Sequence, residues 1–195
     1  MNEFSIVCRI LGTLFQRSPD DSLVKPLIDL IAQDKLKASW PLEQDELWSR
    51  MSTGLDVKAI SADYHALFTG EVPAVSMLAN DYDSEITEAE VREFLTVRGM
   101  SLTDAPTDAF GALLLAASWL EDQAAEDEIA AQEELFDSYI LSWYGTFLGK
   151  VEAHAKTAFY RTLAQITRDA VIALRDELDS EIEWLWQGHI RRGRF

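Results

Sequence analysis

The chain has 195 residues, of which 34 are Asp or Glu and 17 are Lys or Arg, so its formal charge is -17. Hydrophobic residues make up 48% of the sequence, which is typical of a chain with a packed core and excludes a disordered acidic tail. Such a negative surface repels phosphate groups, so we expect no broad nucleic-acid binding and basic partners instead. No apolar run approaches the roughly 18 residues that span a bilayer, and we expect a cytoplasmic protein without stable membrane insertion.

The first third of the chain shows apolar residues at helical spacing. Four helices are predicted there: over residues 4–15, over residues 23–31, from Ser39-Trp40-Pro41 to Met51, and from Asp56 to Phe68. Pro41 is expected near the first position of the third helix, where proline is tolerated. Gly70 follows the fourth helix at the place where a left-handed residue commonly ends a helix.

The region after Gly70 changes character. Residues 71–85 have no sustained period, so we predict a loop of a length that is often functional. Thr87 and Glu90 then match a capping box, and Ile86 and Val91 are placed to form a hydrophobic staple. Gly99 is expected to close this helix.

The second half begins with a short polar stretch, Thr103–Thr107, which contains a proline and is the best candidate for a hinge. It would divide an N-terminal lobe, residues 1–102, from a C-terminal lobe, residues 108–195. Residues 108–120 are apolar nearly all round, as expected of a central helix. Two further apolar patterns follow, and none of the chain shows strand-like alternation. The prediction is an all-α fold, a compact bundle of about eight to ten helices.

Residues that could carry chemistry are sparse. Cys8 is the only cysteine and lies among apolar neighbours, so we expect a buried side chain and no disulfide. His65, His154 and His189 are too far apart to form a helical metal-binding pair, although a fold could still bring them together. The glycines are too scattered for a phosphate-binding loop. Clusters of carboxylates on the helices are interpreted as solvated faces. We therefore expect a binding protein without a cofactor or metal, and not an enzyme.

Three segments in order resemble one known family. They are Asp63–Gly70 (Asp-Tyr-His-Ala-Leu-Phe-Thr-Gly), Ala105–Ala109 (Ala-Pro-Thr-Asp-Ala), and Trp143–Phe147 with Phe159, Tyr160 and Leu163 after it. They are similar to the Tyr-x-x-Leu-Phe-x-Gly, Pro-x-Asp-His and Trp-x-x-x-Phe with Phe-Tyr-x-x-Leu motifs of the TorD/DmsD family of redox-enzyme maturation chaperones, with the YcdY-type branch as the nearest match.

This resemblance implies two lobes around a hinge, in a monomer that sometimes forms a lobe-swapped dimer. It also implies a chaperone that binds an apo-metalloenzyme, a molybdenum oxidoreductase subunit or its twin-arginine leader, and keeps it competent for cofactor insertion. Two departures concern the leader-binding region: Ala109 replaces the family histidine, and Val75-Ser76-Met77-Leu78 replaces the usual loop elements. A client enzyme that is never exported is therefore an alternative.

The family motifs and the acidity together suggest a groove with apolar and acidic walls between residues 71–85 and the hinge, where an arginine can bind a carboxylate bidentately. The candidate client-binding residues are Tyr64, Leu67, Phe68, Gly70, Asp108 and Trp119. The alternatives are that Leu67, Phe68 and Trp119 belong to the core and that Asp108 caps the following helix. Tyr64 is expected at a wet edge because of its hydroxyl.

The last residues, Trp184–Phe195, break the acidic trend with Arg191, Arg192 and Arg194. They form either a frayed basic tail or a segment that docks on the acidic groove. Two rival functions remain at this point: a helical enzyme that binds a small molecule or nucleotide, and a purely structural adaptor.

Overall fold

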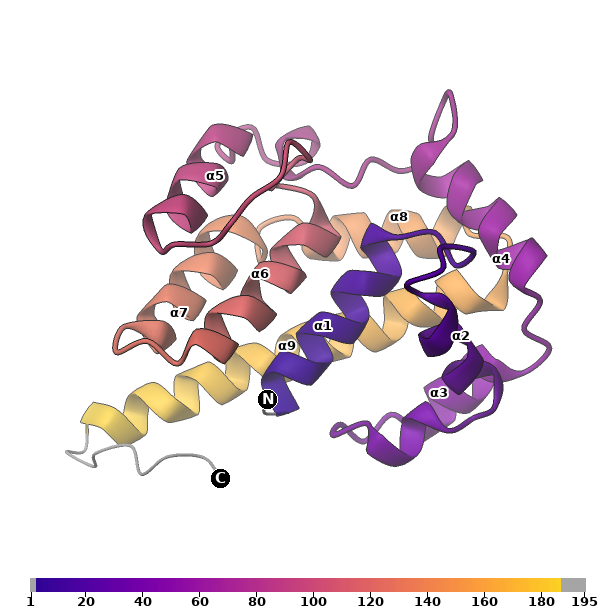
Figure 1. The fold of residues 1–195 in the computed structure, drawn as a ribbon, viewed down its shortest axis with the longest axis horizontal. Helices are drawn as coiled ribbons and strands as arrows, with labels where there is room; N and C mark the ends of the chain where they lie inside the picture. Colours follow the sequence, from indigo (N-terminus) through magenta and orange to yellow (C-terminus); the bar gives the residue numbers. More distant parts are fainter. Residues whose placement is uncertain (1–2, 187–195) are drawn as a thin grey trace.

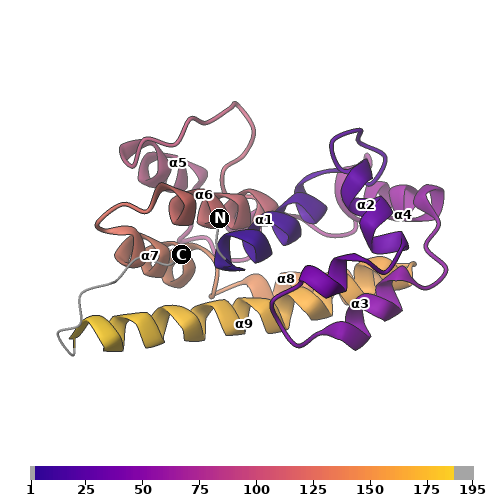
Figure 2. The same cartoon turned by 60° about the horizontal axis from the view of Figure 1, so that its bottom comes forward.

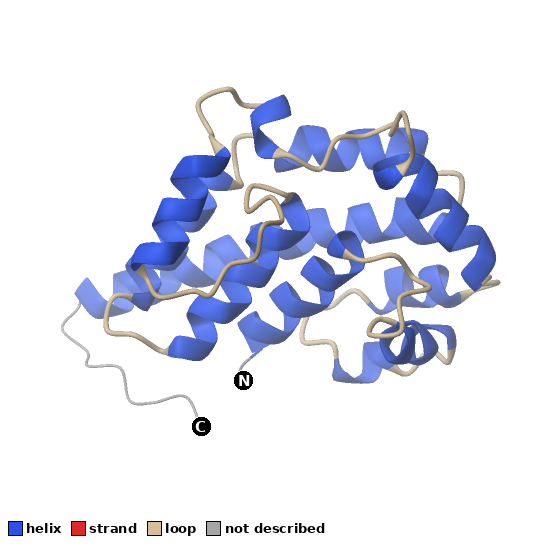
Figure 3. Cartoon of the chain, turned by 45° about the horizontal axis from the view of Figure 1, so that its top comes forward, coloured by secondary structure: helices blue, strands red, loops and turns tan. Residues whose placement is uncertain are grey.

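The computed structural model describes residues 3–186, with the side chains of residues 181–186 left out of the description. This part of the chain forms nine α-helices and no strand-built sheet. They are α1 (Glu3–Gln16), α2 (Lys25–Ala32), α3 (Asp45–Ser52), α4 (Val57–Tyr64), α5 (Glu88–Val97), α6 (Phe110–Gln123), α7 (Glu128–Tyr139), α8 (Tyr144–His154) and α9 (Ala158–Trp186). Three short helices join them: η1 (Leu36–Ser39), η2 (His65–Thr69) and η3 (Ala79–Asp81). The all-α prediction is confirmed (Figure 3).

The longest helix, α9, runs along one side of the molecule and supports the others (Figures 1 and 2). Helices α2, α3 and α4 gather at its N-terminal end, and α5, α6 and α7 gather toward its C-terminal end. Helix α1 lies between the two groups and packs along α6. The arrangement thus joins a helix from the first residues of the chain directly to the central helix of the second half.

The packing of α1 against α6 depends on two glycines at their crossing. A Cβ atom on Gly111 would lie 2.8 Å from both the backbone nitrogen of Gln16 and the carbonyl oxygen of Gly12. A Cβ atom on Gly12 would lie 2.9 Å from the carbonyl oxygen of Gly111. These distances are too short for a side chain, so the two backbones approach each other only because both positions are glycine.

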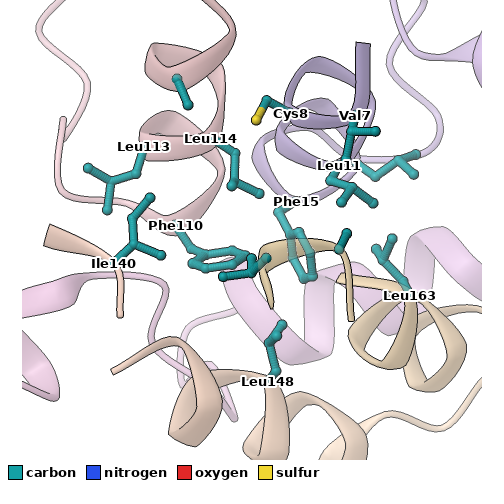
Figure 4. Packing of buried hydrophobic residues seen from close by; sticks show 14 of the residues in the cluster. Val7, Cys8, Leu11, Phe15, Phe110, Leu113, Leu114, Ile140, Leu148 and Leu163 are labelled. Atoms are coloured by element: carbon teal, nitrogen blue, oxygen red, sulfur yellow. The ribbon is translucent and has the colours of Figure 1, made fainter. Parts of the chain in front are cut away.

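A single cluster of buried side chains extends through all of the larger helices. Phe15 and Phe110 meet edge to face at its centre, with ring centroids 5.3 Å apart (Figure 4). The expected burial of Cys8 is confirmed, because its side chain is fully inaccessible. This burial raises the pKa of the Cys8 thiol well above its ordinary value, and the nearby carboxylates of Glu121 and Glu177 raise it further.

Several helix ends follow the sequence signals. Thr87 and Glu90 form both bonds of the capping box at the start of α5, and the side chain of Asp56 accepts a hydrogen bond from the backbone of Lys58 at the start of α4. Gly99 adopts a φ of 87° just after α5, the conformation expected of a helix-ending glycine. Each of these signals is local, so neighbouring residues alone decide the outcome.

Two other helix ends differ from the prediction. Helix α3 begins at Asp45 and not near Pro41. Trp40 is extended, its indole donates to Oε1 of Gln44, and the side-chain nitrogen of Gln44 donates to the carbonyl of Ile166, so residues 40–44 are held outside the helix. Gly70 is not left-handed but extended, with a φ of -68°. The chain ends the fourth helix by a different route: η2 is a π-helical turn, in which the amide of Gly70 donates to the carbonyl of His65 at 2.7 Å.

The division into lobes 1–102 and 108–195 stays a prediction. The buried cluster contains residues from both sides of the proposed hinge, and the α1–α6 contact crosses it.

Candidate functional site

A cavity of about 630 Å³ lies where the end of α1, the π-helical turn η2 and the proposed hinge meet. We call it the hinge pocket. Its lining is Gln16, Arg17, Ser18, Asp21, Tyr64, Thr69, Leu95, Met100, Ser101, Leu102, Thr103, Ala105, Pro106, Thr107, Ala112 and Leu115. A volume of this size is typical of sites that hold a ligand or the side chains of a peptide.

The inner wall of the hinge pocket is apolar and comes from α6 and the end of α5. Ala112 and Leu115 are one helical turn apart on the same face of α6. Leu115 also covers Gly12 of α1, so the α1–α6 crossing helps to form this wall. Leu95 and Met100 complete it from the other side. Such a wall would bury the apolar side chains of a bound segment.

The rim of the hinge pocket carries its polar groups. Arg17 donates to Asp21 at 2.9 Å. Asp21 is the only acidic residue among the described lining residues. Gln16 contributes a buried Oε1 atom that accepts no hydrogen bond within the described residues. An unpaired buried acceptor is costly, so an N–H donor of a bound segment that reached this oxygen would be stabilised there.

Tyr64 is the one predicted residue in the Tyr-x-x-Leu-Phe-x-Gly motif that lines the hinge pocket. Its hydroxyl donates to the carbonyl of Phe15 at 3.1 Å, and only 4% of the residue is exposed. Burial raises its pKa to about 12, opposed in part by the positive charge of Arg17. The expected wet edge is therefore wrong for this residue: the hydroxyl is occupied in tying η2 and α4 to α1.

The other residues of this motif lie behind the pocket wall. Leu67 is 1% exposed and Phe68 is 7% exposed, so the groove exposure expected for them is wrong and the core alternative holds. Phe68 packs against Phe15 and Tyr64, with ring centroids 6.2 and 5.3 Å away. Gly70 closes the π-helical turn and does not line the pocket. The motif shapes the site by fixing the backbone of η2.

Asp108 is also placed differently from the prediction. It is 2% exposed and is not among the pocket lining, because its own carbonyl accepts from Ala79 at 3.1 Å and draws residues 77–80 against the start of α6. Burial raises the pKa of its carboxyl group, opposed by a hydrogen bond from the backbone of Asn80. The capping alternative fails too, since Ala109 is the N-cap of α6 and makes no side-chain cap bond.

Residues 71–85 therefore cover Asp108 instead of forming a groove with the hinge. A bridge between Leu78 and Ala109 pins this loop to the chain just before α6, and no residue of the loop lines the hinge pocket. The pocket lies on the α1 side of the hinge. The predicted location of the groove is corrected accordingly.

The hinge segment itself is held by a clamp from α5. The guanidinium group of Arg92 donates to the carbonyls of Thr103 and Ala105 at 3.0 and 2.9 Å, and to the carboxylate of Glu88. The hydroxyl of Thr107 donates to the same carboxylate at 3.1 Å. The bond from Arg92 lowers the pKa of Glu88. The outer wall of the pocket is thus fixed by two side chains that the sequence reasoning did not single out.

Trp119 is half-buried and lies outside the pocket lining. It follows Leu115 by four residues on α6, so it continues the same face one turn beyond the pocket. A longer bound segment would meet it next. Its assignment as a contact residue stays a prediction.

Asp63, at the start of the same motif, was not singled out either. It is 3% exposed, and its carboxylate accepts from the amides of Lys156 and Thr157 at 3.1 and 2.8 Å and from the hydroxyl of Thr157 at 2.6 Å. It therefore fixes the turn between α8 and α9. A buried acid within a motif is the signal that could have found it, since buried carboxylates are nearly always bonded.

Within the part of the chain that the structure describes, no three His, Cys, Asp or Glu side chains are arranged to hold a metal ion. None of the described helices is long and apolar enough to cross a membrane.

No protein-family model matches the chain. Individual proteins, however, match it over most of its length. The chain is 56% identical over 183 residues to the chaperone protein YcdY of Escherichia coli, an alignment that covers 94% of this chain and all of the relative. The chain belongs to the TorD/DmsD family of redox-enzyme maturation chaperones, in its YcdY-type branch.

Two further relatives match most of the chain. An uncharacterized protein of Haemophilus influenzae is 33% identical over 93% of this chain and 97% of its own length. The Tat proofreading chaperone DmsD of Salmonella typhi is 27% identical over 86% of both chains. The relatives with a stated role are chaperones, so this member of the TorD/DmsD family is a redox-enzyme chaperone and not an enzyme.

Proposed function

We propose that this chaperone holds an apo-metalloenzyme in the cytoplasm, either a molybdenum oxidoreductase subunit or its twin-arginine leader, and that the client enters the hinge pocket. The observation that supports this proposal most directly is the composition of the pocket. It has apolar walls from α5 and α6, and it has a rim with a carboxylate and a free buried acceptor.

The chemistry of a leader suits these groups. An arginine guanidinium group of the client would donate to Oε1 of Gln16 and compete with Arg17 for the carboxylate of Asp21. The apolar residues of the client would leave water against Leu115 and Met100. The DmsD relative is named a Tat proofreading chaperone, which supports a client with a twin-arginine leader for this chain.

The test is co-purification of the tagged chaperone with identification of its client by mass spectrometry. Met100→Glu places a charge on the pocket wall without a partner, so we expect recovery of the client to fall at least about tenfold. Val97→Glu is the matched control, because Val97 is the last residue of α5, three residues before Met100, but is 77% exposed and does not line the pocket. Unchanged recovery with Met100→Glu, in a chain with native circular dichroism, would place the client elsewhere.

The identity of the recovered protein separates the two client classes. A client with a twin-arginine leader, lost on deletion of that leader, supports the molybdoenzyme proposal. A metal-dependent enzyme without a leader supports the non-exported alternative. A partner that is already mature and gains no activity would indicate the structural adaptor instead.

A further inference from the structure

Helix α2 and the turn before it carry more apolar side chains than the core uses. At about 100° per residue, the buried side chains of Val24, Ile28 and Ile31 span an arc of about 60° around the helix. The neighbouring arc of about 100° is also apolar, although it does not belong to the buried core. We call this arc the α2 face, and it consists of Leu23, Pro26, Leu27 and Leu30.

The α2 face is open to solvent in the described part of the chain. Leu23 is 71% exposed and Leu30 is 43% exposed. Pro26 between them is exposed as well, and Leu27 is half-buried. Single exposed leucines are common on protein surfaces, but a contiguous apolar row along one side of a helix is typical of a surface that binds another protein.

The α2 face begins at the rim of the hinge pocket. The amide of Lys25 donates to the carbonyl of Asp21 at 3.0 Å, so the helical turn reaches back to Asp21 and includes Leu23. The carboxylate of Asp21 accepts from the amide of Leu23 at 2.9 Å, and Asp21 itself lines the hinge pocket. In Figure 1 the loop after α1 leads directly into α2. The hinge pocket and the α2 face are therefore two parts of one continuous surface.

The junction between the pocket and the face is acidic. Hydrogen bonds from the backbone of Leu23 and from Arg17 lower the pKa of Asp21, so its carboxylate stays charged. Asp20 is exposed and takes part in no ion pair within the described residues. Lys25 lies about 150° around the helix from the middle of the face. This junction attracts a positive charge and repels an acidic segment.

We infer that the α2 face binds the apolar stretch of a client segment whose arginine lies at Asp21. The inference rests on the function proposed above, and it adds the path of the segment outside the hinge pocket. From Leu23 to Leu30 the face is about 10 Å long at 1.5 Å per residue, which matches about two helical turns or three extended residues of a client. The partner is thus a segment in which arginine directly precedes an apolar stretch.

A second copy of the chain fits the α2 face less well than such a client. Its own α2 face carries the same acidic residues, Asp20 and Asp21, at one end. Four apolar side chains also cover far less than the roughly 800 Å² that each partner contributes to a stable interface. The basic segment 187–195, predicted either to fray or to dock, lies outside the described residues.

Two fluorescent synthetic peptides test the inference by anisotropy with the full-length chain. One has two arginines followed by eight leucine and alanine residues, and in the other serine and glycine replace these eight. We expect the parent chain to bind the apolar peptide at least about tenfold more tightly, because only this peptide removes apolar surface from water on the α2 face. Equal binding of the two peptides, or binding of neither, would overturn the inference.

Substitutions on the α2 face supply the matched comparison. The double variant Leu23→Ser, Leu30→Ser should bind the apolar peptide about tenfold more weakly and the polar peptide unchanged, with native circular dichroism because both positions are exposed. Ile172→Ser is the control, since Ile172 is 49% exposed but lies on α9, and it should leave both affinities unchanged. Equal losses in the double variant and the control would show general stickiness and overturn the inference.

Met100→Glu separates this inference from the function proposed above. If Met100→Glu weakens the apolar peptide and the double variant does not, the hinge pocket keeps its client and the α2 face is overturned. If only the double variant weakens it, the α2 face keeps its ligand and the hinge pocket is overturned as the client site. A dimer of the free chain in light scattering that the double variant dissociates would assign the α2 face to a second copy, and would also overturn the inference.

Discussion

Single residues of the family motifs act mainly as supports in this chaperone. Asp63 does so most clearly, because its buried carboxylate accepts from the amides of Lys156 and Thr157, just before α9, and thereby fixes the turn between α8 and α9. Tyr64, its neighbour, joins η2 to α1. Both residues are needed to keep the hinge pocket in shape, although only Tyr64 reaches it.

Removal of the Asp63 carboxylate should therefore destabilise the fold. In Asp63→Ala the amides of Lys156 and Thr157 lose their acceptor, and we expect the free energy of unfolding to fall by about 1–3 kcal/mol. Urea denaturation followed by circular dichroism measures the change. Glu126→Ala, on an exposed turn, is the control and should stay within about 0.5 kcal/mol of the parent chain.

Two tyrosines, Tyr64 and Tyr82, predict a loss of stability in alkaline solution. Burial raises the pKa values of Tyr64 and Tyr82 to about 12, above the ordinary value of 10. The folded state therefore prefers the neutral phenol, and this contribution is complete below pH 10 and is lost as the pH rises toward 12. Between pH 10 and pH 12 the free energy of unfolding of Tyr64→Phe should fall less than that of the parent chain. Urea denaturation at a series of pH values measures both. Identical pH slopes for the two proteins would contradict this assignment.

At the scale of whole elements, the crossing of α1 and α6 matters most. It brings Gln16, at the end of α1, and Arg17, just after it, to the same pocket as Leu115 of α6, although Leu115 lies about a hundred residues later in the sequence. The close approach at Gly12 and Gly111 is the condition for this arrangement.

A methyl group at the crossing should separate the two helices. Gly111→Ala brings a Cβ atom within 2.8 Å of the backbone of α1, and overpacking of this kind costs about 1–3 kcal/mol despite the better helix propensity of alanine. Gly149→Ala on α8 is the matched control, since nothing lies within 4 Å of its Cβ position. We expect that variant to gain up to about 1 kcal/mol. Thermal unfolding of both variants measures these changes in stability. A Gly111→Ala chain as stable as the parent chain would show that the crossing tolerates a side chain.

The elements that the sequence predicted well are those decided by adjacent residues. Thr87 with Glu90 defines the start of α5, and Gly99 defines its end. The predicted start of α3 was wrong because Pro41 fits the first turn of a helix as well as it fits an extended segment. The bond from Trp40 to Gln44, together with the bond from Gln44 to distant Ile166, selects the extended segment. Local signals could not distinguish these two states.

The candidate site shows the same limit more strongly. The motif pointed to Tyr64, which lines the hinge pocket, but it could not tell that Phe68 and Asp108 are buried, because their cover comes from α1 and from residues 77–80. The hinge pocket joins residues 16–21 to residues 100–107, and their meeting is decided only by the packing of α1 on α6. A sequence pattern carries no information on such a contact.

For the whole molecule, the open question is how the two halves of the chain relate. Residues 103–107 are the only covalent connection between the predicted lobes, while α1 of the first half packs on α6 of the second. If two chains exchanged halves at this connection, the α1–α6 contact would be kept between chains, and only the Arg92 clamp on the hinge would be remade. Exchange of this kind costs little where the folded contacts are the same in both forms.

Shortening of the connection should therefore convert the predicted monomer into a lobe-swapped dimer. Deletion of Asp104 and Ala105 shortens the connection between α5 and α6 from twelve residues to ten and removes one carbonyl that Arg92 holds, which should disfavour the return of α6 to α1 of the same molecule, whereas a second copy can still supply that partner. We expect a dimer in size-exclusion chromatography with light scattering, and native helical content by circular dichroism. Arg92→Gln, which weakens the clamp but keeps the length of the connection, should stay monomeric. A folded monomer after the deletion would show that residues 103–107 do not act as a hinge between exchangeable halves.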